Sequence, residues 1–359
     1  MIGNPSLHLK GKVLDGGWTV GDPVAIGANR SGGTGGNFTV AYHVVGQHGE
    51  RAFLKALDYS RAMNAPVPSV VLQAMTAAYL FECAVLERCG QGNHDRVVRA
   101  LLSGSIMISE STANGVVEYL IFELADGDVR NHLRFSQEFD LAWRLRSLHH
   151  IATGLKQLHS SGIAHQDLKP SNILVFEGRI SKLADLGRAS YQGHSPDHDE
   201  LAFAGDPIYA PPDLAYGFNP SEWNMRRLSC DAYHLGSMVV FFFAGAGMTP
   251  LLLKHLDRAF HPAARPFNGG WTGTFEDVLS YLREAFDQAV VEFGDQIHNV
   301  MLKEKLIVIV RQLCEPDSRL RGHPMTRRKS GNSFSLERYI TDFDLMARRA
   351  EIGMYAETA

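Results

Sequence analysis

Hydrophobic and polar residues alternate through the first third of the chain, and clusters of glycine interrupt the alternation. This pattern predicts β-strands over residues 18–26, 38–45 and 51–57. A helix is expected over residues 69–89, with Ser69 as its N-cap and Gly90 as its stop. Further strands are predicted over residues 96–102, 105–109 and 116–124. The first third therefore predicts a β-rich region with one main helix.

Beyond residue 125 the apolar residues recur at helical spacing. An amphipathic helix that ends at Gly162 is predicted from Leu141, Leu145, Leu148, Ala152, Leu155 and Leu158. The longest apolar run, residues 238–253, contains Gly245 and Gly247. Its unbroken part is too short to cross a bilayer, so it is interpreted as one buried helix.

The last part of the chain predicts a loop over residues 327–332 and then a final helix. One face of that helix carries Leu336, Tyr339, Ile340, Phe343 and Ala347. An apolar face of this kind is expected to pack on the helical region. We divide the chain into a β-rich lobe (1–124), a helical lobe (125–325) and a C-terminal helix packed on that lobe (326–359).

Composition narrows the function classes. The 359 residues are 45% hydrophobic and 21% charged, with a formal net charge of -4. This balance provides no general attraction to nucleic acid or to an anionic membrane. The four cysteines form no CxxC pair and no secretory signal is evident, so a reduced, cytoplasmic setting is expected. Nothing in the sequence indicates an oligomeric state.

The candidate chemistry lies in residues 163–175 and 185–187. Asp167, Lys169 and Asn172 share one short loop before an apolar strand, and Asp185 follows Asn172 by thirteen positions. Phosphoryl transfer to a hydroxyl uses such groups: a carboxylate for the hydroxyl proton, a cation for the phosphate, and oxygen ligands for magnesium. The residues therefore favour a kinase reaction.

The two segments resemble the catalytic loop and metal-binding motif of eukaryotic-type serine/threonine protein kinases. The resemblance implies an α+β, bilobal protein-kinase fold. It also implies ATP and Mg²⁺ as cofactors and a protein as substrate. Asp167 would act as general base or orient the acceptor hydroxyl, and Lys169 would stabilise the transferring γ-phosphate. Asn172 and Asp185 would hold two magnesium ions.

A glycine-rich stretch between two predicted strands is a candidate phosphate cradle, since glycine lets backbone N–H groups approach phosphate oxygens. By resemblance, Lys55 would hold the α- and β-phosphates, and Glu82 on the following helix would pair with it. Glu87 is the competing candidate. Nucleotide-binding residues are expected at Gly33, Thr34, Gly35, Gly36, Val40, Phe53 and Lys55.

The chain departs from the family pattern near the nucleotide. Phe38 stands where a third glycine is usual, and Phe53 where a small alanine is usual. A ring at Phe53 would either narrow the adenine site or stack on the base. At the hinge, Glu123 and Ala125 are expected to present backbone groups to adenine. Asp128 is either a ribose contact or a solvated turn residue.

More distal motifs extend the resemblance over residues 16–322. Asp213 matches the carboxylate that ends the substrate-positioning segment, and Arg319 is its expected partner. Asp231 matches the family's buried helix aspartate. Small-molecule kinases of related fold generally lack the substrate-positioning segment that ends at Asp213, so a protein substrate is favoured.

Two positions bear on regulation. Gln166 replaces the arginine that receives an activation-loop phosphate in many protein kinases, and a neutral amide cannot form that charge-assisted pair. We therefore predict that activity needs no loop phosphorylation, and that joint alanine replacement of Ser190, Tyr191 and Ser195 retains most activity. Asp206 stands where a threonine is usual and leaves the acceptor choice open.

The activation loop already carries Asp197, Asp199 and Glu200. His194 and His198 lie among these acids, and they form either a solvated loop or a metal site.

The sequence thus predicts a protein serine/threonine kinase. Two other classes stay open: a pseudokinase that binds nucleotide and signals by shape, and a kinase that acts on a small molecule.

Overall fold

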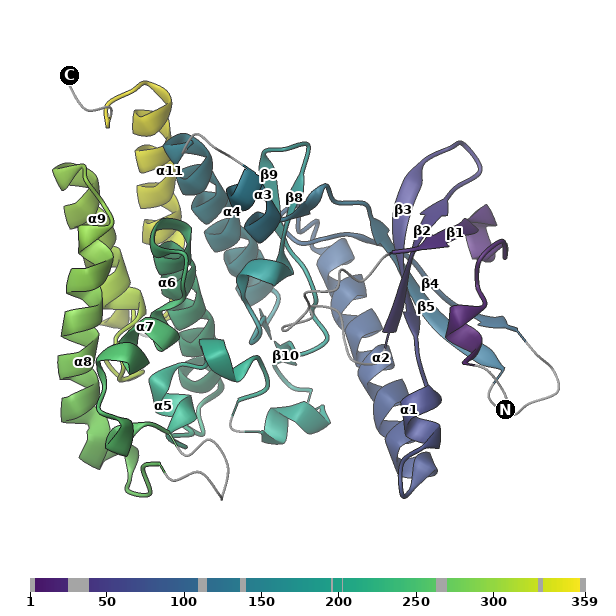
Figure 1. Ribbon diagram of the computed structural model, residues 1–359, viewed down its shortest axis with the longest axis horizontal. Coiled ribbons are helices and arrows are strands. Elements are labelled where there is room, and N and C mark those ends of the chain that lie inside the picture. Colours follow the sequence, from purple (N-terminus) through teal and green to yellow (C-terminus); the bar gives the residue numbers. More distant parts are fainter. Residues whose placement is uncertain are drawn as a thin grey trace. The chain divides into compact units, whose positions relative to one another are not determined.

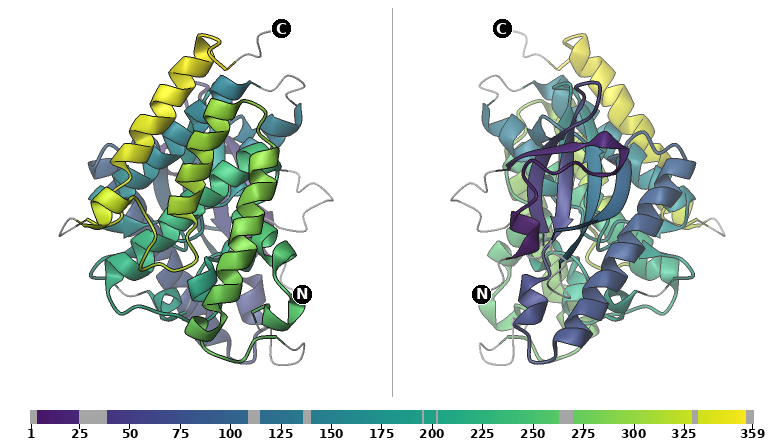
Figure 2. Two further views of the ribbon diagram at one scale, coloured as in Figure 1. Left: turned by 90° about the vertical axis from the view of Figure 1, so that its left-hand side faces the viewer. Right: turned by 90° about the vertical axis from the view of Figure 1, so that its right-hand side faces the viewer.

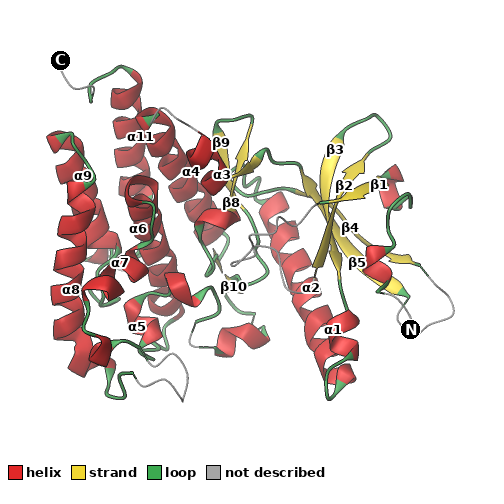
Figure 3. Cartoon of the chain, viewed as in Figure 1, coloured by secondary structure: helices red, strands yellow, loops and turns green. Residues whose placement is uncertain are grey.

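The computed structural model describes residues 4–24, 39–108, 115–135, 140–194, 196–201, 203–262, 270–328 and 332–355. The chain separates into two compact units. The first contains Met1–Asp126 and Ala184–Gly187, and the second contains Gly127–Leu183 and Arg188–Ala359. A β-sheet dominates the first unit, and helices dominate the second (Figure 3).

The sheet of the first unit is antiparallel, with strand order β1-β2-β3-β5-β4 (Figure 1). Its strands are β1 (Thr19–Pro23), β2 (Thr39–Val45), β3 (Arg51–Leu57), β4 (Ala100–Met107) and β5 (Val116–Glu123). The two strands expected over residues 96–102 and 105–109 are wrong. They form one strand, because Ser103 and Gly104 continue the pairing with Leu120 and Tyr119 across the expected break.

One face of this sheet carries the hydrophobic core of the unit, and the N-terminal segment covers that face. Leu9 is fully buried and Leu14 is almost so. The Tyr42 hydroxyl donates to the Ser6 carbonyl at 2.7 Å, and the Tyr119 hydroxyl donates to Asp15 Oδ2 at 3.2 Å. The core continues through Val20, Val44, Ala52, Leu54, Ala56, Val117 and Ile121.

Helices α1 (Ser60–Met63) and α2 (Pro68–Gln91) belong to the first unit, and α2 packs against β4. The expected caps of α2 are wrong. The N-cap is Val67, without a side-chain hydrogen bond, and Pro68 occupies the first turn, where its missing N–H costs nothing. The helix also continues past Gly90. By its length and composition alone, α2 could cross a membrane. This is weak evidence for a membrane-spanning segment, because core helices of folded domains can have the same length and composition.

The second unit contains the remaining helices and two small antiparallel sheets. The sheets have the orders β6-β8-β9 and β10-β7, with strands β6 (Gly127–Asp128), β7 (Ile163–Ala164), β8 (Ile173–Phe176), β9 (Ile180–Leu183) and β10 (Ser190–Tyr191). The helices are α3 (Val129–Phe135), α4 (Leu141–Ser160), α5 (Pro212–Ala215), α6 (Ser229–Ala244), α7 (Met248–His255), α8 (Phe275–Asp295), α9 (Val300–Leu313), α10 (Pro324–Arg327) and α11 (Glu337–Glu351).

The single helix expected over residues 238–253 is wrong. The segment contains the end of α6 and most of α7, and the chain bends by 79° between them. Gly245 ends α6 in the left-handed conformation (φ 76°), which glycine adopts without steric cost. A Cβ atom on Gly247 would lie 2.8 Å from Ser237 Oγ, so this turn also packs too closely for a larger residue.

Helix α4 contacts α6, β7, β9 and α11 within the second unit. Asp140 caps its N-terminus by accepting a hydrogen bond from Trp143 N at 2.9 Å. Helix α11 packs along α4 (Figure 2). Arg146 of α4 forms ion pairs with Asp344 and Glu351 of α11, so this contact is polar at its edge and apolar along Tyr339 and Phe343.

Candidate active site

Strand β3 places Lys55 beside two carboxylates in the first unit. Lys55 Nζ lies 2.9 Å from Glu82 Oε1 on α2 and 3.4 Å from Asp185 Oδ1. Burial disfavours the charged amine, but the two carboxylates outweigh it and raise the pKa of Lys55. Glu87 is exposed and, among the described residues, accepts a hydrogen bond from Gln91 Nε2 of its own helix. The expected pairing of Lys55 with Glu82 is therefore present, and Glu87 has no part in it.

The register of β2 and β3 decides which residues share the face of Lys55. Phe53 lies two positions before Lys55 on the same face, and Ala41 pairs directly with Lys55. Val40 pairs with Ala56 and packs against the core on the other face. The expectation that Val40 contacts nucleotide is therefore not supported by its position. Gly33, Thr34, Gly35, Gly36 and Phe38 lie outside the described residues.

The catalytic-loop residues form a second group, in the second unit. Asp167 Oδ2 lies 3.1 Å from Lys169 Nζ and accepts a hydrogen bond from Asn172 Nδ2 at 3.2 Å. Asp167 Oδ1 accepts from Asp206 N at 2.8 Å, and Lys169 Nζ also lies 3.6 Å from Asp206 Oδ2. Asp167 is thus held on both oxygens while Lys169 bridges two carboxylates.

Asn172, in the second unit, and Asp185, in the first unit, each carry a side-chain oxygen of the kind that binds Mg²⁺. Asn172 Oδ1 is buried and has no hydrogen-bond partner among the described residues, although its Nδ2 donates to Asp167. Asp185 adopts a left-handed backbone (φ 62°), a strained conformation for a residue with a Cβ atom. Carboxylate and amide oxygens are the ligands that Mg²⁺ prefers.

The hinge candidates differ in their contacts. Glu123 Oε1 accepts from Arg99 N at 2.8 Å, so this carboxylate secures the end of β5. Ala125 lies in the coil that follows β5. Asp128 accepts from Arg130 N and Asn131 N at the start of α3 and forms an ion pair with Arg130. These contacts place Asp128 in the turn before α3, with its side chain only 12% exposed, and its role as a ribose contact stays a prediction.

Comparison with known proteins decides the family. The model of the protein kinase domain matches residues 33–321. The chain belongs to the protein kinase family. Its kinase domain is 30% identical to an Aurora kinase of Debaryomyces hansenii over 128 residues and 32% identical to that of Schizosaccharomyces pombe over 130 residues. It is 33% identical to the serine/threonine-protein kinase PLK4 of Xenopus laevis over 129 residues.

These alignments cover 35%, 36% and 35% of this chain, in the same order. The chain spans 30%, 34% and 13% of the three relatives' own lengths. The family assignment confirms the α+β kinase fold with a sheet lobe and a larger helical lobe, and it implies ATP-dependent phosphoryl transfer, generally with Mg²⁺.

One pairing expected in the kinase domain is wrong. Asp213 pairs with Arg321, not with Arg319: Arg321 Nη2 lies 2.8 Å from Asp213 Oδ1, and both side chains are buried. Arg319 remains partly exposed and pairs with Asp317 and Glu276. The turn that precedes residue 321 directs this guanidinium inward, where it also donates to the carbonyls of Ser229, Glu315 and Pro316.

Asp231 organises the backbone of the catalytic loop, as expected for a buried helix aspartate. Its carboxylate accepts from His165 N at 2.7 Å, from Gln166 N at 2.9 Å and from Gln166 Nε2 at 3.1 Å. His159 Nε2 lies 2.9 Å away. Burial would raise the pKa of Asp231, but these hydrogen bonds and the nearby histidines lower it. Asp231 is therefore a structural anion.

Arg227 is a contact of Gln166 that the sequence did not reveal. Its side chain is almost fully buried, donates to Gln166 Oε1 at 3.2 Å and forms an ion pair with Asp199 Oδ1 at 3.0 Å. It lies in a π-helical turn, Asn224–Leu228, that precedes α6. In the sequence, Arg227 is one of two consecutive arginines that precede Asp231 by five and four residues. Such a pair is equally typical of a solvated surface, so the sequence does not predict its burial.

The histidines of the activation segment have other contacts. His198 is buried, with Nε2 2.8 Å from the Ala189 carbonyl, and His194 stacks on Tyr191. Within the described part of the chain, no group of three or more metal-binding side chains gathers.

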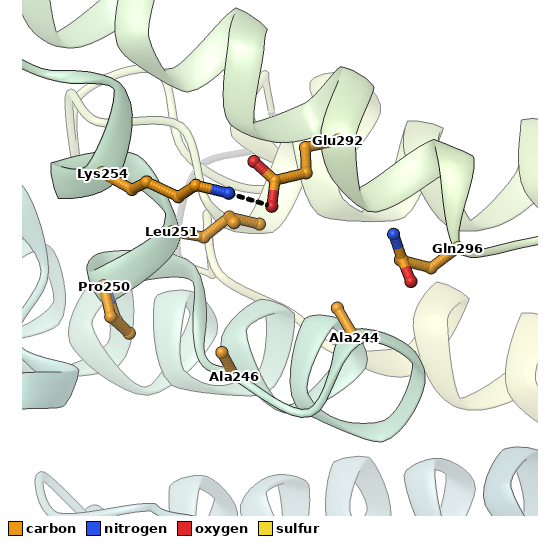
Figure 4. A pocket seen from close by; sticks show the side chains of 7 residues that line it. All are labelled: Ala244, Ala246, Pro250, Leu251, Lys254, Glu292 and Gln296. Atoms are coloured by element: carbon orange, nitrogen blue, oxygen red, sulfur yellow. Dashed lines mark hydrogen bonds and ion pairs between the residues drawn. The ribbon is translucent and has the colours of Figure 1, made fainter.

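A separate hollow lies between α6, α7 and α8, with a volume of about 320 Å³ (Figure 4). Ala244, Ala246, Pro250 and Leu251 form its apolar side, and Lys254 pairs with Glu292 at its rim at 2.7 Å. None of the catalytic-loop residues lines it. The hollow holds one ion pair beside apolar side chains, and none of the residues proposed for phosphoryl transfer lines it. It is therefore not part of the candidate active site.

Proposed function

We propose that this chain is a protein kinase that transfers the γ-phosphate of Mg-ATP to serine or threonine and needs no phosphorylation of its activation loop. The observation that carries the proposal is that both charged groups are complete: Lys55 with Glu82 and Asp185, and Asp167 with Lys169 and Asn172. A cytoplasmic setting is part of the proposal, and all four cysteines are free thiols.

The chemistry of the first group is phosphate binding. Lys55 stays protonated because Glu82 and Asp185 raise its pKa, so it can offer a permanent positive charge to phosphate oxygens. Glu82 holds the amine through both carboxylate oxygens, at 2.9 and 3.2 Å. This fixes the cation before nucleotide arrives, and a fixed charge costs little reorganisation during the reaction.

The second group provides the acceptor chemistry. Asp167 is held by Asp206 N on one oxygen and by Asn172 on the other, which leaves its carboxylate oriented to bind an acceptor hydroxyl and take its proton. Lys169 can then stabilise negative charge on the phosphoryl oxygens. When bound, Mg²⁺ would neutralise charge on the phosphates, and Asn172 Oδ1 and Asp185 are the groups that would hold it.

Independence from loop phosphorylation is supported by the surroundings of Gln166. Its amide is buried and fully engaged: Nε2 donates to Arg227 O and Asp231 Oδ1, and Oε1 accepts from Arg227. It therefore offers nothing to a phosphate. Ser190 is also buried, so this hydroxyl is closed to a modifying enzyme in this conformation.

The test is transfer of labelled γ-phosphate by purified protein, alone and with a generic basic protein acceptor, after phosphatase treatment. Asp167→Ala and Lys55→Ala are the comparison variants. The proposal predicts phosphoserine or phosphothreonine with wild type and its loss in both variants. Persistence of transfer in Asp167→Ala would reject the assigned acceptor chemistry.

A pseudokinase is the second candidate, because Phe53 is a bulky residue on the face of Lys55. ATP binding measured by calorimetry separates the two. No ATP binding and no transfer would favour the scaffold. Acceptor screening with small hydroxylated and aminated compounds would detect the third class, a small-molecule kinase.

A further inference from the structure

The activation segment of the kinase domain is fastened to the turn before α6 by two arginines. Arg227 Nη2 donates to the Asp199 carbonyl at 2.8 Å and lies 3.0 Å from Asp199 Oδ1. Arg226 Nη2 donates to the carbonyls of Asp199 and Leu201 at 3.0 and 2.7 Å. The carbonyls of Asp199 and Leu201 thus accept hydrogen bonds from neighbouring guanidinium groups, and the Asp199 carboxylate adds an ion pair.

The second oxygen of Asp199 is also engaged. Ser190 Oγ donates to Asp199 Oδ2 at 3.0 Å, and Trp223 Nε1 donates to Ser190 Oγ at 3.0 Å. Asp199 therefore joins β10, through Ser190, to the turn before α6, through Arg227. With one oxygen accepting a hydrogen bond and the other in an ion pair, this carboxylate is a fixed part of the fold rather than a solvated loop charge.

The same arginine reaches the residue before the catalytic aspartate. Arg227 Nη1 donates to Gln166 Oε1, and the Gln166 amide returns a hydrogen bond to the Arg227 carbonyl. Gln166 has a left-handed backbone (φ 64°), which an L residue keeps only when its surroundings hold it. Its conformation sets the direction in which the chain enters Asp167.

The other end of the segment also meets the catalytic loop. Asp206 N donates to Asp167 Oδ1 at 2.8 Å. A Cβ atom on Gly205 would lie 2.4 Å from the Gln166 carbonyl oxygen, so the two backbones are in close contact. The segment that starts at Asp199 therefore ends on Asp167 itself, and fixing one end limits the freedom of the other.

We propose that Asp199 and Arg227 are positioning residues that hold Asp167 through Gln166 and the activation segment, with the Asp199 carboxylate supplying the anchoring charge. This inference rests on the proposed function and concerns its regulation. The charge that anchors the activation segment is the Asp199 side chain itself, so it is present without any phosphorylation. Gln166 suits this arrangement because a neutral amide can both accept from Arg227 and donate to Asp231.

The test compares Asp199→Asn with Asp197→Asn. Asp197 is exposed and lies two residues away, so both variants lose one negative charge from the same turn. A displacement of about 1 Å among reacting groups can lower turnover about 100-fold. We expect kcat of Asp199→Asn to fall about 10- to 100-fold with KM for ATP unchanged, and Asp197→Asn to match wild type.

Hydrogen–deuterium exchange provides a readout that does not depend on catalysis. Faster exchange over residues 199–206 is expected in Asp199→Asn and not in Asp197→Asn. Asp199→Glu keeps the charge and should recover part of both kcat and protection, and it also replaces Asp199→Asn if that variant does not fold. Unchanged kcat and unchanged exchange in Asp199→Asn would overturn the inference.

Failure of the proposed function gives a different result. Wild-type protein would then transfer no phosphate under any condition, while the exchange comparison would still decide whether Asp199 holds the segment. Slower turnover in Asp199→Asn without faster exchange would also reject the anchor, because the carboxylate would then act by another route.

Discussion

Arg321 and Arg319 lie two residues apart, yet the structure gives them opposite environments. Arg321 is fully buried and pairs with Asp213, whereas the side chain of Arg319 is 44% exposed. Replacing each by methionine removes the same group and retains most of the side-chain length. We expect Arg321→Met to destabilise the kinase domain strongly and Arg319→Met to have a small effect.

The magnitude follows from the partners that are left behind. Removing one member of a buried ion pair typically costs about 3–5 kcal/mol, because the other charge stays buried without compensation. Asp213 would be that charge, with an exposure of only 1%. Arg321 also donates to Glu315 O at 2.9 Å. The partner of Arg319, Asp317, is also buried, but it would keep Arg283 Nη2 at 3.5 Å and the backbone N–H of residue 319 at 3.1 Å. Because the guanidinium of Arg319 is itself 44% exposed and screened by water, we expect its loss to cost about 1 kcal/mol or less.

Denaturation monitored by urea titration and by differential scanning calorimetry would measure both variants at neutral pH. For a unit of about 150–250 residues, each kcal/mol shifts Tm by roughly 2–4 °C, so Arg321→Met should lower Tm by roughly 6–20 °C. Arg319→Met should lower Tm by no more than about 4 °C. The double variant Arg321→Met/Asp213→Asn should lose less than the sum of the single changes, because the stranded charge is gone.

An equal or larger loss in Arg319→Met would refute this reasoning. It would mean that Asp213 depends on Arg319 in solution, as the sequence alone suggested. Additive single changes in the double variant would also count against the pair, because partners in direct contact are not independent.

The remaining predictions concern the active site and acid stability. Glu82→Gln should lower kcat/KM for ATP about 10- to 100-fold by removing a charged partner of Lys55, while Glu87→Gln at an exposed position should change it less than about twofold, as steady-state kinetics would show. Asp206 adds a carboxylate 3.6 Å from Lys169 Nζ, so we expect wild type to prefer serines flanked by arginine and Asp206→Thr to lose about fivefold of that preference in a peptide panel; an unchanged ranking would contradict this. Burial lowers the pKa of His234 to about 4, so the folded state binds fewer protons than the unfolded state between pH 6.5 and 4, and stability present above pH 6.5 is lost as the pH falls. His234→Gln should flatten that loss by up to roughly 3 kcal/mol in urea titrations at pH 7 and 4.5, and parallel profiles would rule out this histidine as the cause.

Short motifs made the kinase chemistry readable from the sequence. Lys55 and Glu82 are 27 positions apart, but each belongs to a motif with its own local pattern, a strand and a helix, and the structure joins them at 2.9 Å. The same holds for Asp167 and Asn172, which share one loop. Residues whose partners are fixed by local geometry are the ones that pattern reasoning finds.

The sequence does not identify the partners of residues whose contacts depend on tertiary packing. The choice between Arg319 and Arg321 depends on a turn whose direction no periodicity describes. Arg227 has no motif, and its burial depends on the π-helical turn around it. For Val40, the sequence predicts the strand but not the face of the sheet on which the side chain lies. A one-residue difference in the register of β2 against β3 decides that face.

The sequence has two glycines, Gly245 and Gly247, at the helix break, but its apolar run predicts one continuous helix. Apolar residues on both sides of the break are buried, and burial alone does not separate one long helix from two short ones. The positive φ of Gly245 is a property of the folded backbone, and a glycine in the sequence permits it without requiring it.

The N-terminal segment has a consequence for anyone who excises this domain. The family match starts at residue 33, whereas the fold begins to bury side chains at Ser6. An expression product cut at the family boundary would lose β1 and would uncover Tyr42, Val44 and Tyr119. Such a patch of aromatic and branched side chains on an open sheet promotes self-association. The boundary for recombinant work should therefore follow the packed strand and its leading segment, and not the alignment.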